Sequence, residues 1–470
     1  MMLVRWQDNH LRPAPDPCAL LQSARLPNNV PRCEMRRVAA IVVFLCAGSL
    51  YGQWTFGTRI ELRANYRDSK EAKRALAFPF PPSFLPVGQT TGFLETVDAG
   101  RHTELSVAQI RLDANYGNWF AAHAQLHGQD KYRRNPTSED RKTDADELWL
   151  RVGQKPEFLD RPEGTSFFIQ GGKFPHMERQ PTRLLESYGL AATAFNRFED
   201  VGFMGGGSIG RNLYWRLSGT SGNPLYFRDS NALAGDNGIK ELLQPNPDPE
   251  LKAGIPILYN TETEGYFLKT DHVQFGQGIG YRWQNAAQTF GFDAIVFHYR
   301  RSMADAETLT GTFYKADLRL LEGPPGFNIS LPITGRRKEE TGTRIYTEWR
   351  GLTGTVQYTK QLFAGLHREG EELEVGYQIP WSFGPSVGGE SLVQGIQPAV
   401  RWSGLQNDFK GPRNFVDPSM WWNWVKIDYG VRIGFAKHVD VTAEHAKHII
   451  VVPGPRLRPD ETLVTLRVRI

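Results

Sequence analysis

The last ten residues of the chain, Glu461 to Ile470, alternate apolar and polar side chains up to the final position. The apolar residues, at every second position, are Val464, Leu466, Val468 and Ile470. The polar residues between them are Thr465, Arg467 and Arg469. Strict alternation predicts a β-strand with two unlike faces. Such a strand fits a soluble sandwich with an apolar core, or a transmembrane barrel with an apolar outer face. A strand that runs to the chain end favours a closed barrel, because its last strand pairs with its first.

The same alternation recurs along the chain, which predicts many strands rather than one. The ranges with this pattern are 54–68, 108–116, 146–153, 212–219, 279–284, 314–321, 343–350, 372–379, 400–402 and 425–435. A two-residue turn at Gly117-Asn118 predicts a hairpin. Polar loops rich in Pro, Gly, Asp and Asn separate the strands, and short turns alternate with long loops. This organisation is typical of an up-and-down outer-membrane barrel.

The most apolar stretch lies near the front of the chain, at 35–52. It begins with Arg36 and Arg37, continues through a short apolar block and ends in small residues, which is the pattern of a secretory signal peptide. We therefore expect residues 1–34 to be untranslated or disordered, residues 35–52 to be the signal peptide, and residues 53–470 to form one barrel. Cys18, Cys33 and Cys46 all precede residue 53, so no disulfide or thiolate site is predicted in the mature chain.

The composition distinguishes a β-barrel from a helical membrane protein. The mean hydropathy is −0.44 although aromatic residues make up 12% of the chain, and no run of about 20 apolar residues could form a spanning helix. Tyr and Trp lie near strand ends, as expected at membrane interfaces, although aromatic residues also pack in soluble β-cores. The aromatic residues at these positions are Trp54, Tyr66, Tyr116, Trp349, Trp402 and Trp421–Trp424. The predicted fold is all-β, a transmembrane antiparallel barrel of about 16–18 strands, which is wide enough for an aqueous channel.

The polar strand faces are rich in arginine. The whole chain has a formal net charge of only +4, which predicts no nucleic-acid partner, yet basic residues outnumber acidic ones about two to one on these faces. Arginine binds phosphate or carboxylate through two parallel hydrogen bonds, so such a lumen favours anions. The alternative is that Arg–Glu pairs brace the inner wall. The candidate pore-lining residues are Arg59, Arg63, Arg111, Arg151, Lys173, Arg216, Arg282, Lys315, Arg319, Arg344, Arg350, Arg401, Lys426, Arg432 and Arg467.

Residues 167–200 carry a family resemblance. Gly172-Lys173-Phe174-Pro175 resembles the strand end of outer-membrane porins of the phosphate-selective O and P type, although the sequence after it departs from the Pro-Phe-Gly expected there. Arg179-Gln180 and Arg197-Phe198-Glu199-Asp200 are similar to elements of alginate-export barrels. Both resemblances imply a large channel, with different cargo. The porin resemblance also implies a homotrimer.

Two motifs that often carry chemistry are better explained as structure. Gly205-Gly206-Gly207-Ser208-Ile209-Gly210 matches nucleophile-elbow and dinucleotide patterns, but its flanks predict strands and not the strand–turn–helix that those sites need. His123 and His127 point to the same side of a strand about 13 Å apart, too far to share a metal ion. The sequence therefore predicts no catalytic residues, no metal and no cofactor.

We expect a passive porin for small polar or anionic solutes in the outer membrane of a Gram-negative-type bacterium, with membrane lipid around it. Three alternatives remain open. An export channel for an anionic polysaccharide would use the same barrel. A barrel enzyme or adhesin would carry a Ser/His/Asp cluster at one rim. A secreted soluble β-protein would bury the apolar faces and extract without detergent.

Overall fold

The computed structural model describes the chain from residue 54 onward, with gaps. The described residues are 54–69, 73–76, 92–95, 100–128, 143–156, 164–180, 182–196, 199–222, 225–227, 258–259, 273–302, 310–311, 337–363, 366–387, 389–408, 423–435, 438–451, 456, 458 and 460–470. The expected signal peptide and the strand predicted at 314–321 lie outside these ranges. Contacts between residues gather Thr55–Ile470 into one compact unit.

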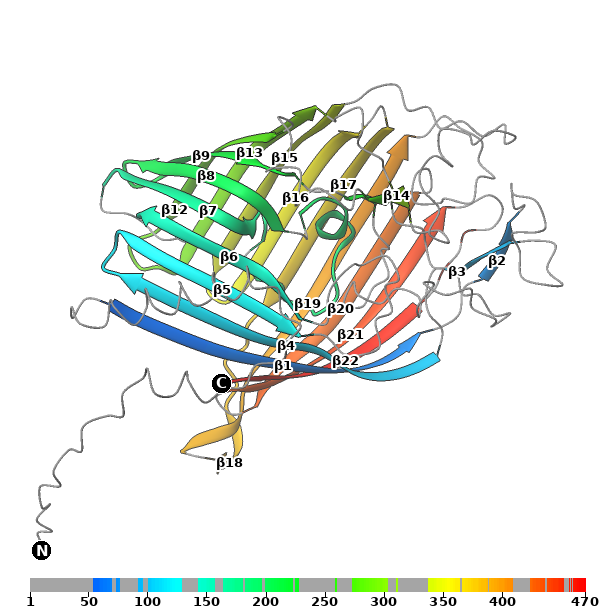
Figure 1. Cartoon of the computed structure of the whole chain (residues 1–470). Helices are drawn as coiled ribbons and strands as arrows, with labels where there is room; N and C mark the ends of the chain where they lie inside the picture. Colours follow the sequence, from blue (N-terminus) through cyan, green and yellow to red (C-terminus); the bar gives the residue numbers. More distant parts are fainter. Residues whose placement is uncertain are drawn as a thin grey trace, which may run out of the picture. The chain divides into compact units, whose positions relative to one another are not determined.

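Sixteen antiparallel strands form a closed barrel (Figure 1). The wall strands are β1 (Trp54–Ser69), β4 (Gly100–Tyr116), β5 (Phe120–Gly128), β6 (Thr143–Gly153), β7 (Ser166–Pro175), β8 (Glu199–Ile209), β9 (Leu213–Thr220), β12 (Gln274–Gln284), β13 (Phe290–Ser302), β15 (Arg337–Trp349), β16 (Leu352–Phe363), β17 (Leu366–Tyr377), β19 (Glu390–Asp408), β20 (Asn423–Phe435), β21 (Val439–Val451) and β22 (Asp460–Arg469). Each pairs with the wall strand before it and the one after it, which confirms the predicted up-and-down topology.

The remaining short strands are not part of the wall. β18 (Phe383–Val387) pairs with the beginning of β19 and projects from one end of the barrel (Figure 1). β10 (Leu225–Phe227), β11 (Leu258–Tyr259) and β14 (Thr310–Gly311) form one small sheet, and β2 (Lys73–Leu76) pairs with β3 (Gly92–Glu95). No helix in the described ranges is long and apolar enough to cross a bilayer.

The final strand closes the barrel against the first. β22 is antiparallel to β1, with Val468 opposite Leu62 and Arg467 opposite Arg63. The backbone amide of Ile60 donates to the carbonyl of Ile470 at 2.8 Å, and the amide of Ile470 donates back at 2.9 Å. The alternating sequence at the chain end therefore forms the seam of the barrel, and no edge of the wall sheet is left open.

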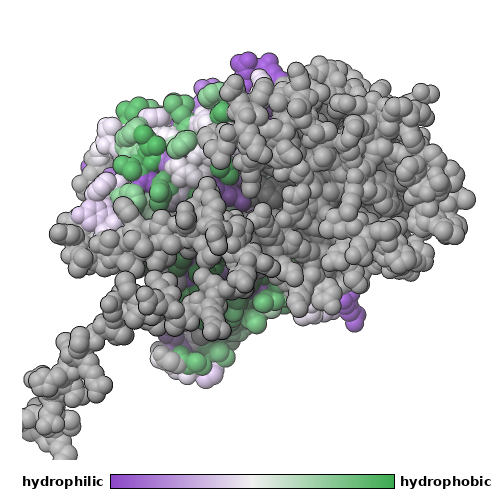
Figure 2. Space-filling model, in the orientation of Figure 1, coloured by the Kyte–Doolittle hydropathy of each residue, from purple (hydrophilic) through white to green (hydrophobic). Residues whose placement is uncertain are grey.

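The wall is apolar outside and polar inside. Outward side chains such as Leu150 and Phe203 are 54% and 58% exposed, whereas Arg401 and Asp428 on the inner face are 1% and 0% exposed. Figure 2 shows hydrophobic side chains gathered on the visible outer face of the described wall. A soluble β-protein would bury its apolar face instead, so this distribution identifies a barrel whose outer surface is in contact with lipid.

The two ends of the barrel differ in their connections. Turns of a few residues join β4 to β5, β8 to β9 and β15 to β16, and the C-terminus lies at this end together with β18 (Figure 1). At the other end most connections are long, as between β9 and β12. Outer-membrane barrels place short turns on the periplasmic side and longer loops outside the cell.

The structure corrects three local predictions. The turn after β4 has three residues, Gly117 to Trp119, rather than two. Arg350, predicted on a strand face, lies exposed in the tight turn after β15, with a positive φ of 46°. Trp424, predicted to face outward, is buried on the inner face beside His448, because it shares the parity of Lys426.

Candidate functional site

The connection from β7 to β8 folds into the barrel instead of projecting from it. We call residues 176–195 the inner segment, of which 176–180 and 182–195 are described. The chain enters it through the Gly172-Lys173-Phe174-Pro175 stretch. Gly172 has φ +132°, and a Cβ at that position would overlap the carbonyl oxygen of Leu148 on the neighbouring strand. Glycine is therefore required at this position of β7, shortly before the inner segment begins.

Wall carboxylates accept hydrogen bonds from the backbone of the inner segment. The amides of Glu186 and Ser187 both donate to Glu444 on β21, each at 2.7 Å. The amide of Leu184 donates to Glu374 on β17 at 2.5 Å. These bonds satisfy amides that irregular backbone would otherwise bury without partners.

Basic wall side chains bind the carbonyl and hydroxyl groups of the same segment. Lys426 on β20 donates to the carbonyl of Tyr188 at 2.5 Å, and Arg368 on β17 donates to the carbonyl of Ala194 at 2.7 Å. Arg401 on β19 donates to the hydroxyl of Ser187 at 2.6 Å and also pairs with Glu374 and Asp428. The inner segment is thus held by charge-assisted hydrogen bonds along most of its length.

The strand order shows that the inner segment crosses the lumen. It leaves from β7, but its anchors lie on β1 and on β17 to β22, which occupy the opposite side of the ring. The contacts reach as far as Arg467, 281 residues away in sequence. A segment held on both sides of a wide barrel narrows the passage through it.

Glu186 lies at the centre of an arginine cluster. Its carboxylate pairs with Arg467 at 2.9 Å, Arg432 at 3.0 Å and Arg63 at 3.3 Å. Burial by itself would raise the pKa of Glu186, but Arg63, Arg467, Arg432 and Arg183 together lower that pKa to about 2. Glu186 is therefore ionised at every physiological pH.

The beginning of the inner segment has a second charged cluster. His176 lies between two carboxylates, with Nδ1 3.2 Å from Glu178 and Nε2 3.1 Å from Asp200 on β8. Burial would lower the pKa of His176, but Asp200 and Glu178 raise that pKa well above its usual value. The Tyr299 hydroxyl donates to the other Glu178 oxygen at 2.7 Å, which ties the segment to β13.

The end of the inner segment is a helical turn packed on the wall. The π-helical turn η2 (Ala192–Asn196) places Phe195, which is fully buried, over Gly370 of β17. A Cβ on Gly370 would overlap the Phe195 ring. The Arg368 guanidinium lies 4.7 Å from the centre of the same ring, in cation–π geometry. Apolar packing and charge therefore fix this turn together.

Most of the arginines and lysines predicted to line the pore have acidic or aromatic partners. Arg344 pairs with Asp293 at 2.9 Å, and Arg282 lies 4.2 Å from the Tyr214 ring centre. Arg216 stacks 4.9 Å from the ring centres of both Phe168 and Tyr214. Arg63, Arg401, Lys426, Arg432 and Arg467 contact the inner segment. The structure brings these last five together around one feature.

The remaining predicted positions are more scattered. Arg151 lies at the short-turn end and lines a cavity of about 370 Å³ together with Lys155. Arg111 and Lys173 are half-buried, Arg59 is exposed near the beginning of β1, and Arg350 lies in a turn. Lys315 and Arg319 lie outside the described residues.

The motifs set aside at the sequence level have structural explanations. All but the last residue of the glycine-rich stretch belongs to β8, where a Cβ on Gly206 would approach the Trp215 carbonyl and the Phe168 ring. His123 pairs with Asp113 at 2.7 Å and His127 with Asp146 at 3.1 Å, so the two histidines have separate partners.

The inner segment itself was not recognised from the sequence. Its residues show no alternation and no helical period, so no pattern separates it from an external loop. The acidic wall residues that anchor it, Glu374 and Glu444, were not singled out either. One signal was present in the sequence: two glutamates and two arginines share this loop with three leucines and three alanines.

The similarity of this chain to known proteins is limited to the fold. No protein-family model matches the sequence, and no curated protein matches it either. Similar solved structures include OmpT, an outer membrane protein of Vibrio cholerae, with a TM-score of 0.46, 8% identity and coverage of 89% of this chain and 99% of that chain. Pseudomonas putida OprB has a TM-score of 0.48, 7% identity and coverage of 88% and 94%. The outer membrane channel DcaP of Acinetobacter baumannii has a TM-score of 0.43, 8% identity and coverage of 89% and 97%. The barrel resembles outer-membrane proteins of Gram-negative bacteria.

Proposed function

We propose that this barrel is a porin, a passive diffusion channel for small polar solutes in an outer membrane, with a preference for anions. The observation that carries the proposal is the inner segment, which crosses a polar lumen and is anchored to the far wall by Glu374, Glu444 and Arg401. Such a segment limits the size of the solutes that pass.

The size of the barrel supports diffusion through the lumen. A barrel of about 16 strands leaves an aqueous channel, whereas one of about eight strands is filled by its own side chains. The inner segment is a single stretch of chain, which supports a narrowed rather than a filled lumen. The protein would therefore narrow the passage without sealing it.

The arginine cluster supports the anion preference. Arg63 and Arg432 pair with Glu186, yet their side chains remain 19% and 18% exposed. Guanidinium groups of this kind can also bind a passing carboxylate or phosphate. Many other wall arginines are paired with acids, so the preference we propose is modest. A homotrimer is a further part of the proposal and rests on family resemblance.

Single-channel recording tests the proposal. The detergent-purified protein, reconstituted in a planar bilayer with a salt gradient, is expected to give stable conductance steps and a reversal potential on the anion side. Stable steps with a cation-side reversal potential would keep the porin and reject the anion preference. A folded, heat-modifiable barrel without steps would reject the channel.

A further inference from the structure

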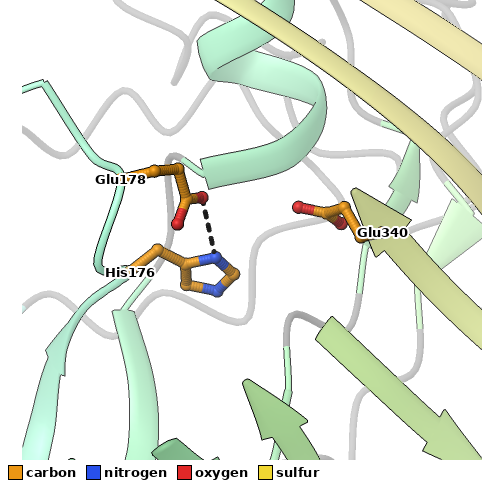
Figure 3. Close-up of side chains that lie close together, drawn as sticks. All are labelled: His176, Glu178 and Glu340. Carbon is orange, nitrogen blue, oxygen red and sulfur yellow. Dashed lines mark hydrogen bonds and ion pairs between the residues drawn. The ribbon is translucent and has the colours of Figure 1, made fainter. Parts of the chain in front are cut away.

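The buried cluster at the beginning of the inner segment combines a histidine with carboxylates from two distant parts of the chain. His176 and Glu178 belong to the inner segment, and Glu340 belongs to β15, several strands away around the ring. One nitrogen of His176 and one oxygen from each glutamate lie within 4.8 Å of one another. Figure 3 shows the Glu340 carboxylate directed toward Glu178 and the imidazole of His176.

The Glu340 carboxylate is only partly satisfied. Its side chain is 1% exposed, and Oε2 accepts a hydrogen bond from Gln361 at 2.8 Å. Its other oxygen, Oε1, has no hydrogen-bond donor among the described residues. A buried carboxylate oxygen without a partner costs free energy, and proteins usually compensate such charge with an opposite charge or a metal ion.

The charged groups around this cluster favour the binding of a cation. Asp200 adds a third buried carboxylate beside His176, and its Oδ1 also has no hydrogen-bond donor among the described residues. Buried Lys338 on β15 contributes one positive charge, and its ammonium group donates to the Gln274 side chain at 3.0 Å. Three carboxylates around one imidazole therefore form an acidic site even with this lysine nearby.

The donor set indicates the class of metal. An imidazole nitrogen with carboxylate oxygens suits zinc and similar divalent transition metals better than calcium or magnesium, which prefer oxygen ligands alone. A tetrahedral zinc ion at ordinary bond lengths holds its donor atoms about 3.4 Å apart. The three groups would move inward by about 1 Å, which side-chain rotation can supply.

We propose that His176, Glu178 and Glu340 bind a divalent transition-metal ion that ties the beginning of the inner segment to β15. Asp200 lies 3.1 Å from Nε2 of His176 and can orient the imidazole as its hydrogen-bond partner. The ion would add a link to the wall at the end of the segment opposite η2. This proposal does not depend on which solutes pass through the barrel.

Zinc binding to the purified full-length protein tests the site. The barrel in detergent is stripped with EDTA and titrated with ZnCl₂, and retained zinc is counted by mass spectrometry after gel filtration. We expect saturation at one zinc per chain and an increase of several degrees in the temperature at which the barrel unfolds on a gel. The Glu340→Gln variant keeps the shape and the Gln361 contact but should lose affinity by at least about tenfold.

A neighbouring position on the same strand provides the matched control. Glu339 is half-buried on β15 and pairs with Arg337 instead, so Glu339→Gln should bind zinc like the unchanged protein. Equal zinc binding by Glu340→Gln and Glu339→Gln would overturn the proposal. If Glu340→Gln does not fold, the unchanged protein decides alone, and a titration without saturable zinc binding would overturn it.

Discussion

Glu186 gathers Arg63, Arg432 and Arg467 from three strands that are far apart in the sequence. Ion pairs that are largely buried add little net stability by themselves, because each charge has lost much of its water. Removing one partner is costly, since the others remain buried and uncompensated. The cluster therefore acts as a specific clasp that holds the inner segment in one position.

The pH dependence of this clasp follows from the Glu186 carboxyl. Its pKa is about 2 in the folded protein, below the ordinary value of 4.5. A lowered pKa adds stability above pH 4.5, and the contribution is lost as the pH falls toward 2. The difference corresponds to about 3 kcal/mol. We expect the difference in unfolding temperature between the unchanged protein and Glu186→Gln to be constant from pH 8 to 5 and to shrink below pH 4.5.

Thermal unfolding across this pH range measures the effect. Glu390→Gln, at an exposed site on β19, is the control and should show no difference at any pH. A difference that disappears between pH 6 and 7 would mean that another group, and not Glu186, governs the clasp.

At the same scale, the sequence placed Arg401 and Arg467 on the inner faces of their strands but could not assign their partners. Parity alone put Arg401 and Arg467 on the polar face of their strands. Whether such an arginine meets solute, a wall acid or the inner segment depends on residues hundreds of positions away, such as Glu186 for Arg467. Arg350 was misplaced because a turn interrupts the alternation one residue earlier than the pattern indicated.

At the scale of secondary-structure elements, η2 packs closely against β17. The ring of Phe195 occupies the space above Gly370, where any side chain would overlap it. Gly370→Ala should therefore displace η2 and lower stability by about 1–3 kcal/mol. It should also lower the single-channel conductance, because η2 moves away from the wall and further into the lumen. Unfolding temperature and conductance measure the two effects.

Gly205→Ala is the control for this substitution. A Cβ on Gly205 of β8 would lie 3.7 Å from its nearest neighbour, the Phe168 carbonyl oxygen, which is an ordinary contact. Unchanged stability and conductance in both variants would show that Phe195 does not depend on the glycine.

β13 shows why the alternation of apolar and polar residues did not predict every strand. Its inner face carries Ile295, Phe297 and Tyr299, which are all buried. The alternation expected for a barrel strand would place polar residues at these positions. The inner segment packs against this side of the barrel, as the contact of Met177 with the Tyr299 hydroxyl shows. Apolar residues on both faces abolish the alternation, so the strand resembles a buried strand of a soluble protein.

For the whole molecule, closure depends on the last residues. Ile470 exchanges two backbone hydrogen bonds with Ile60, and Val468 and Arg467 continue the seam. Removing residues 466–470 would expose an open edge within the membrane, where unpaired backbone groups cost several kcal/mol each. We expect that the truncated chain, after refolding in detergent, gives no compact heat-modifiable band on an unheated gel.

An insertion elsewhere is the control for the truncation. Two extra residues after exposed Asn118, in the turn between β4 and β5, leave every strand pair intact and should not prevent refolding. If the truncated chain still gives a compact heat-modifiable band, the β1–β22 seam is not needed for closure.

The sequence by itself determined the class of fold, the faces of most strands and the closing role of residues 461–470. These properties follow from a period of two residues, which is local and survives in any strand with one apolar and one polar face. The tertiary structure alone decided that residues 176–195 enter the lumen. That segment has no period, and its anchors lie up to 281 residues away, so only the closed ring of strands brings Glu374, Glu444 and Arg467 to face it.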